Sequence, residues 1–152
     1  MRDPFQQISK NFWKKDIYKL CKEKRYDEAW RHANASLEKV MEYVASGKWR
    51  ENDKFKLDTN NEVFNAVEFE VLNITTHLFA IFRAMAGICH REKKYNKELT
   101  YYLISTTMDP STKPSLEKVI EKLKEKADNP KQAEKEAKII SKRWLDLLGT
   151  IK

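Results

Sequence analysis

The sequence predicts an all-α fold, a single-domain bundle of about six helices, and three observations lead to this prediction. Apolar residues recur every three to four positions along most of the chain, which is the spacing of one helix face. Only three glycines and four prolines occur among 152 residues, so few residues favour tight turns or long loops. No segment has the pattern of a strand. Apolar residues make up 41% of the chain, which suffices for the core of one domain, residues 1–152.

Residues 7–46 are expected to form a helical hairpin. Its first helix covers residues 7–24 and carries an apolar stripe made by Ile8, Phe12, Ile17, Leu20 and Cys21. The second helix runs from Asp27, a candidate N-cap, to Ser46, and Gly47 stands just past its end, where a C-terminal glycine belongs. The connection between the two helices is short, which predicts that they are antiparallel.

Residues 48–61 are expected to form the longest loop, because they are polar and carry no periodicity. The next helix, over residues 62–93, is expected to lie at the centre of the bundle. From Leu78 to Cys89 it is apolar on nearly every face, with Arg83 its only charged residue, and a helix that is apolar all round is a buried one. The other helices should pack around it. The sequence leaves open whether this helix is continuous.

Three shorter helices are expected in the C-terminal part, residues 96–148. They cover 96–107, 115–127 and 130–148. Pro110 and Pro114 are expected to break the chain between the first two helices. The last helix begins with a clear signal, because Asn129 can cap it and a proline occupies its first position, and Gly149 is expected to end it.

The net charge of the chain is +7, with positive residues spread along its length. This permits contact with nucleic acid or an acidic partner, although lysines interleaved with glutamates are also typical of solvated helix faces. No signal peptide is evident, and no stretch approaches the about 20 uncharged apolar residues of a membrane span, so no membrane contact is expected.

The cysteines and histidines do not predict a metal site. Cys21 and Cys89 lie outside any Cys/His cluster, so they are expected to be small buried hydrophobes of a cytoplasmic, reducing environment. His77 and His90 stand thirteen residues apart on one helix and therefore on different faces, and His32 lies on another helix. We expect neither a metal nor a cofactor.

Arg83 and His90 are the candidate catalytic pair. They lie seven residues apart, about two helical turns, so both project from one face of the central helix. An imidazole can move a proton from a ribose hydroxyl while a guanidinium steadies the phosphate charge, which is the chemistry of RNA cleavage. The alternative, which the sequence favours, is that each side chain has its own structural partner and that His90 marks the end of the helix.

Two groups of residues are candidates for binding. The first lies in the polar loop, where aromatic and basic side chains could stack on bases or anchor a partner: Trp49, Arg50, Lys54, Phe55 and Lys56. The alternative for these aromatics is a loop that folds back onto the bundle. The second group follows the central helix, where Arg91, Lys93 and Lys94 could bind phosphate or could simply be a solvated helix end.

Residues 22–44 resemble the opening helical hairpin of HEPN-type domains. The resemblance lies in the turn Tyr26-Asp27-Glu28-Ala29 and in the Ala33 and Glu38-Lys39 that follow. HEPN ribonucleases also carry an Arg and a His on a later helix with four to six residues between them, a spacing that Arg83 and His90 match. The resemblance implies metal-independent RNA cleavage across a homodimer, typical of defence and toxin systems, although many HEPN domains only bind. Ala84 departs from the family, which usually has a polar residue there.

Residues 79–110 are similar to a tetratricopeptide unit, the rival resemblance. Phe82, Met85, Ala86, Tyr95, Tyr102 and Pro110 fall near the signature positions of that repeat, and residues 13–43 form a poorer second copy. This resemblance implies helical hairpins that bind proteins.

The sequence therefore favours a non-catalytic α-helical interaction module over an enzyme. Its expected partner is a protein or a nucleoprotein complex, RNA is a possible ligand, and a homodimer is possible. The alternative is a HEPN-like endoribonuclease that uses Arg83 and His90.

Overall fold

The computed structural model of the protein describes residues 17–47, 49 and 66–149. Over these residues the chain forms α-helices and one short 3-10 helix, and it has no strand. The elements in chain order are α2 (Tyr18–Lys22), α3 (Tyr26–Ser46), α4 (Ala66–Arg91), α5 (Tyr95–Met108), η4 (Pro110–Thr112), α6 (Lys113–Lys126) and α7 (Pro130–Leu147). The prediction of an all-α bundle is confirmed.

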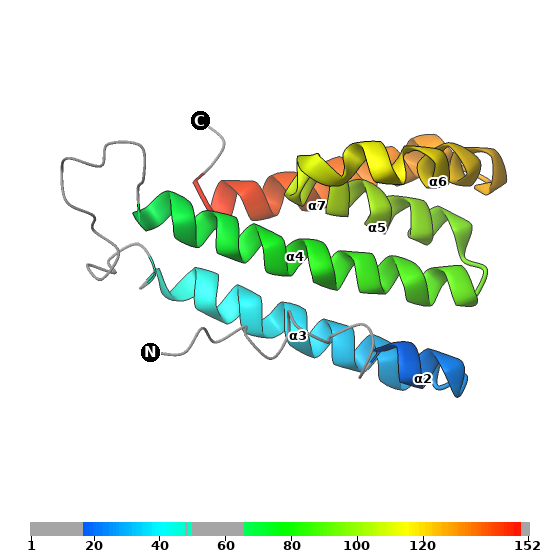
Figure 1. The fold of residues 1–152 in the computed structure, drawn as a ribbon, viewed down its shortest axis with the longest axis horizontal. Coiled ribbons are helices and arrows are strands. Elements are labelled where there is room, and N and C mark those ends of the chain that lie inside the picture. The colour runs from blue at the N-terminus through cyan, green and yellow to red at the C-terminus, as the bar shows by residue number, and fades with distance from the viewer. Residues whose placement is uncertain (1–16, 48, 50–65, 150–152) are drawn as a thin grey trace.

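The helices pair into three antiparallel hairpins, α2 with α3, α4 with α5, and α6 with α7 (Figure 1). Figure 1 shows the three hairpins side by side, with their tight turns gathered at the same end of the molecule. Two hydrogen bonds tie the turns together. The Trp30 indole donates to Glu92 Oε1 at 2.8 Å, and the Asn129 amide donates to Asn96 Oδ1 at 3.2 Å. The array is thus linked across hairpins at its turn end.

The first two turns have the same backbone structure. In each, a lysine with φ of 60° follows the helix end, Lys24 in one turn and Lys93 in the other. The Arg25 amide donates to the Leu20 carbonyl at 2.8 Å, and Lys94 does the same to Cys89 at 2.9 Å. This six-residue closure around a left-handed residue is a Schellman motif, which satisfies carbonyls that the helix end would leave open. The resemblance between the two hairpins therefore extends to their turn geometry.

Helix α4 lies between α3 on one side and α5 on the other, as Figure 1 shows, and it is central in the bundle as predicted. It is continuous through Thr75 and Thr76, whose hydroxyls both donate to the Leu72 carbonyl, at 3.0 Å and 2.8 Å. The expected helix began at residue 62, and residues 62–65 lie outside the described part of the chain. The observed end at Arg91 falls two residues before the expected one.

One segment of α4, Glu70–Arg91, is long and apolar enough by composition to cross a membrane, which corrects the expectation that no described stretch approaches a span. In the structure, 56% of the apolar 18-residue stretch within this segment is buried inside the bundle. The core helix of a helical bundle has the same length and composition, because it too is apolar on every face.

Two apolar clusters hold the hairpins together. The larger one joins α2, α3 and α4 with parts of α5 and α7, and includes Val40, Ile81 and Trp144. The smaller one lies among α5, α6 and α7, and includes Leu99 and Leu123. Phe79 and Leu103 pack against both clusters, so α4 and α5 connect the two halves of the molecule.

Most of the predicted helix ends are confirmed. Asn129 caps α7 by accepting from the Gln132 amide at 3.2 Å, and Gly47 and Gly149 end their helices with φ of 68° and 69°. Asp27 is not a cap, because α3 begins one residue earlier, at Tyr26, and Arg25 stands at the cap position. Pro114 does not break the chain but lies in the first turn of α6, where its missing N–H costs nothing.

Candidate functional site

Arg83 and His90 both lie on the exposed side of α4, but each has its own partner on α5. The Arg83 guanidinium carbon lies 5.3 Å from the centre of the Tyr102 ring. His90 Nδ1 lies 3.1 Å from Glu98 Oε2. Seven residues of helix separate the two positions by about 10 Å along the axis. Neither side chain is held toward the other.

The carboxyl group of Glu98 is the most unusual polar group near this pair. Its side chain is 2% exposed, Oε2 faces His90, and Oε1 has no hydrogen-bond partner among the described residues. Burial raises the pKa of this carboxyl, and the nearby His90 offsets part of the rise. A histidine that contacts a buried carboxylate is oriented and stabilised by it.

Trp49 is buried, which corrects its prediction as an exposed binding residue. Its side chain is 2% exposed and packs in the larger apolar cluster, and its indole N–H donates to the Val44 carbonyl at 3.1 Å. The chain after α3 therefore folds back onto the bundle at this point, the alternative that the sequence left open. The other candidates of the loop, Arg50, Lys54, Phe55 and Lys56, lie outside the described residues.

The structure places the three basic candidates, Arg91, Lys93 and Lys94, at the turn end of the array. Arg91 lies 5.0 Å from the centre of the Tyr18 ring, and Lys94 Nζ lies 3.4 Å from Glu92 Oε2. A hollow of about 570 Å³ opens beside the second turn and is lined by Lys93, Lys94, Tyr95, Asn96, Lys97, Lys126 and Asp128. All of these lysines are exposed, so the turn end is a solvated basic surface.

The two cysteines are buried, as predicted. Cys21 and Cys89 are 1% and 0% exposed and form no disulfide. Burial raises the pKa of the Cys21 thiol and raises that of Cys89 to about 12, so both are thiols at neutral pH. Among the described residues no three His, Cys, Asp or Glu side chains gather in a way that could hold a metal ion.

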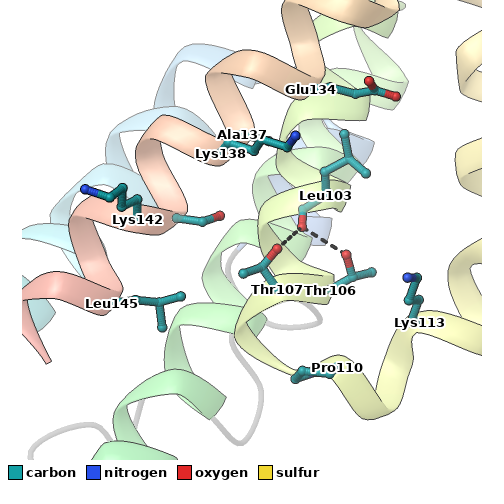
Figure 2. A pocket seen from close by; sticks show the side chains of 11 residues that line it. Leu103, Thr106, Thr107, Pro110, Lys113, Glu134, Ala137, Lys138, Lys142 and Leu145 are labelled. Atoms are coloured by element: carbon teal, nitrogen blue, oxygen red, sulfur yellow. Dashed lines mark hydrogen bonds between the residues drawn. The ribbon is translucent and has the colours of Figure 1, made fainter. Parts of the chain in front are cut away.

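A groove that sequence reasoning missed lies along α5. Helix α5 forms its floor, α7 forms one wall, and the chain around η4 and the start of α6 forms the other (Figure 2). The groove has a volume of about 680 Å³. Its lining is Leu103, Thr106, Thr107, Pro110, Lys113, Glu134, Ala137, Lys138, Ser141, Lys142 and Leu145.

The floor of the groove offers no free polar group. The Thr106 and Thr107 hydroxyls both donate to the Leu103 carbonyl, at 2.9 Å and 3.0 Å, as Figure 2 shows, so neither hydroxyl is a free donor. Ala137 is 4% exposed and leaves space between the helices. Ser141 is 5% exposed, and its hydroxyl has no hydrogen-bond partner among the described residues. The groove is therefore apolar at its base, with one buried hydroxyl beside it.

The rim of the groove is basic. Lys138 reaches over Leu103 from α7, and Lys113 faces it from the opposite wall, as Figure 2 shows. Neither lysine makes an ion pair within the part of the chain that the structure describes. By contrast Glu134, the one acid of the rim, lies 3.3 Å from Lys124 Nζ and is neutralised by it.

A weak sequence signal for the groove was present. Ala133, Ala137 and Ser141 repeat every four residues on α7, so one strip of that helix carries only small side chains. Such a strip allows either close helix packing or an open channel. Only the position of α5 and of η4 decides between the two.

No family model matches the chain. Searches of curated proteins and of solved structures also find no match.

Proposed function

We propose that the protein is a non-catalytic helical interaction module, and that it binds a segment of a protein partner in the groove between α5 and α7. The groove is the observation that carries this proposal. It combines an apolar base, a charged rim and a volume within the range of ligand sites in proteins, roughly 300–1,000 Å³. An apolar groove between two helices is suited to the apolar face of a third helix.

The arrangement of Arg83 and His90 supports a binding role over catalysis. RNA cleavage by this pair needs both side chains at one phosphate, but each is occupied by its own partner on α5, Tyr102 and Glu98. Removing the pair from those partners would also leave the buried Glu98 carboxyl without its neighbour. The ribonuclease alternative would need both side chains to turn toward one phosphate, within one chain or together with a second copy.

A selection of peptides tests the proposal directly. A display library of random peptides is selected on the purified protein, and the affinity of the enriched peptides is measured by fluorescence anisotropy. Thr107→Trp, which fills the groove, should weaken binding at least about tenfold, because a filled groove excludes the anchoring side chains. Thr76→Trp is the matched control, since Thr76 is also exposed and also bonds the carbonyl four residues back, but lies on α4 outside the groove.

Equal effects of the two tryptophan variants, or no enriched peptide at all, would contradict the proposed binding site. The same protein is incubated with a mixed single-stranded RNA, which should stay intact on a gel. Shortening of the RNA that is lost in both Arg83→Ala and His90→Ala would instead establish the ribonuclease.

A further inference from the structure

The size of the groove sets the size of its occupant. Its wall on α7 runs from Glu134 to Leu145, twelve residues of helix whose ends lie about 16 Å apart at 1.5 Å per residue. A helix laid along this wall would contact it over about three turns. Anchors at positions i, i+3 or i+4, and i+7 of the occupant would then reach the base made by Leu103 and Ala137.

The charge of the rim sets the charge of the occupant. The one acid that lines the groove, Glu134, lies 3.3 Å from Lys124 Nζ, and Asp146, just beyond the α7 wall, lies 3.4 Å from Lys142 Nζ. Lys113 and Lys138 make no ion pair within the described ranges, so the uncompensated charge at the opening is positive. The charge of the chain, +7, disfavours a second copy as the occupant, since like charges would meet at the rim.

From these observations we infer that the groove takes a short acidic amphipathic helix of another protein. This inference rests on the proposed function and specifies its ligand. The apolar face of the helix lies on Leu103 and Ala137, and carboxylates on its flanks face Lys113 and Lys138. A nucleic-acid strand would satisfy the two lysines, but its phosphate backbone has no apolar face to cover the base of the groove.

Three synthetic peptides test the ligand class. They share one apolar helical face with leucines at i, i+4 and i+7, and their polar positions carry glutamates, glutamines or lysines. Binding to the full-length protein is measured by fluorescence anisotropy at low and at high salt. The acidic peptide should bind about tenfold more tightly than the basic one at low salt, and this difference should shrink at 1 M salt because exposed charge pairs are screened.

A charge reversal tests the two lysines. Lys113→Glu/Lys138→Glu should weaken the acidic peptide about tenfold and strengthen the basic one. The control is Lys118→Glu/Lys122→Glu, which changes the net charge equally at exposed positions of α6 that do not line the groove. The control should bind the acidic peptide like the wild type. All four positions are exposed, and circular dichroism checks that both variants are folded.

The outcomes separate this inference from the proposed function. Equal affinity of the three peptides, with binding still lost in Thr107→Trp, would overturn the charge requirement while the groove remains a binding site. Equal losses in the two charge-reversal variants would show a non-specific attraction and overturn the inference. A labelled single-stranded RNA that binds more tightly than the acidic peptide and depends on Lys113 and Lys138 would also overturn it. Failure of every peptide would count against both proposals.

Discussion

Glu98 shows how one residue can link two helices at a cost. Its carboxyl is almost fully buried between α4 and α5, yet only one of its oxygens has a partner among the described residues, the His90 ring. Taking a charged carboxylate out of water is unfavourable unless its hydrogen bonds are replaced. The contact with His90 therefore satisfies one oxygen of Glu98 and leaves Oε1 without a partner among the described residues.

The burial of Glu98 predicts a pH dependence of stability. Because the pKa of this carboxyl is raised in the folded protein, the folded state holds the proton more tightly than the unfolded state. This contribution to stability is complete below the ordinary pKa of a glutamate and is lost as the pH rises through the raised pKa. Glu98→Gln removes the titration, so its free energy of unfolding should rise relative to wild type between pH 4 and pH 7, as urea unfolding measures.

The control for this prediction is Glu117→Gln, the same substitution at an exposed position of α6. Its free energy of unfolding should run parallel to that of the wild type over the same range. A difference between Glu98→Gln and wild type that is constant with pH would show that the Glu98 carboxyl does not titrate differently on folding.

The buried cysteines predict slow thiol chemistry. Only the thiolate reacts with alkylating reagents, and burial both excludes the reagent and raises the pKa, to about 12 for Cys89. At pH 8 iodoacetamide should label neither Cys21 nor Cys89 in the native protein, and should label both in concentrated urea. Mass spectrometry counts the adducts. A surface cysteine introduced by Lys118→Cys should react at once, and rapid labelling of the wild type would show that the bundle opens locally.

At the scale of the elements, the turns carry information that periodicity does not. In the first two hairpins the first helix, α2 or α4, is followed by a lysine, Lys24 or Lys93, at a left-handed position that favours glycine. By contrast, α3 and α7 are followed by glycines in the same conformation. A side chain with a Cβ is strained there by roughly 1–2 kcal/mol. The turns keep their shape because the Schellman hydrogen bonds and the packing on both sides determine it.

This strain predicts that one glycine substitution stabilises the protein. Lys93→Gly should raise the free energy of unfolding by about 1 kcal/mol, a gain of about 2–4 °C in the melting temperature for a chain of this size. Lys97→Gly, the same change in the first turn of α5, should instead lower stability by about 0.5–1 kcal/mol because glycine is a poor helix former. Thermal unfolding followed by circular dichroism measures both. A loss of stability in Lys93→Gly would show that the lysine side chain itself supports the turn.

Gly47 provides the reverse experiment. A Cβ added at this residue would meet no atom within 4 Å, so Gly47→Ala meets no steric clash with neighbouring groups. Its φ of 68° nevertheless remains unfavourable for alanine, and the substitution should cost about 1 kcal/mol through the backbone alone. Urea unfolding measures this loss. An unchanged midpoint would mean that the end of α3 relaxes to another conformation.

At the scale of the whole molecule, the two apolar clusters share helices and should not unfold separately. Phe79 and Leu103 contact both clusters, and the turns are joined by the Trp30–Glu92 and Asn129–Asn96 hydrogen bonds. A hairpin array in which each unit contacts only its neighbour can unfold from one end. The shared contacts across α4 and α5 oppose such stepwise unfolding in this protein.

A substitution in the smaller cluster tests this cooperativity. Leu123 is 4% exposed in that cluster, and Leu123→Ala should cost about 2–5 kcal/mol because it leaves a cavity. Trp49 and Trp144 belong to the larger cluster, so tryptophan fluorescence reports mainly on the other half of the molecule. The urea midpoints by fluorescence and by circular dichroism should fall together. A fluorescence midpoint that stays at the wild-type value would show that the clusters unfold independently.

The sequence by itself determined the helices and most of their ends, because these depend on residues within about four positions of one another. The apolar face of α4 and the Asn129 cap are of this kind. It also placed Arg83 and His90 on one face of α4, since their spacing follows from helical geometry alone. The function and the partners that the sequence suggested remain proposals.

Only the tertiary structure decided which groups meet. Arg83 meets Tyr102 and His90 meets Glu98, Trp49 turns inward although its neighbours in the sequence are polar, and the groove combines residues from 103 to 145. These results depend on how each helix is rotated about its own axis and on how near its neighbours pack. Side-chain packing across the core sets both the rotation of each helix and its distance from its neighbours, and neither can be predicted from a local pattern in the chain.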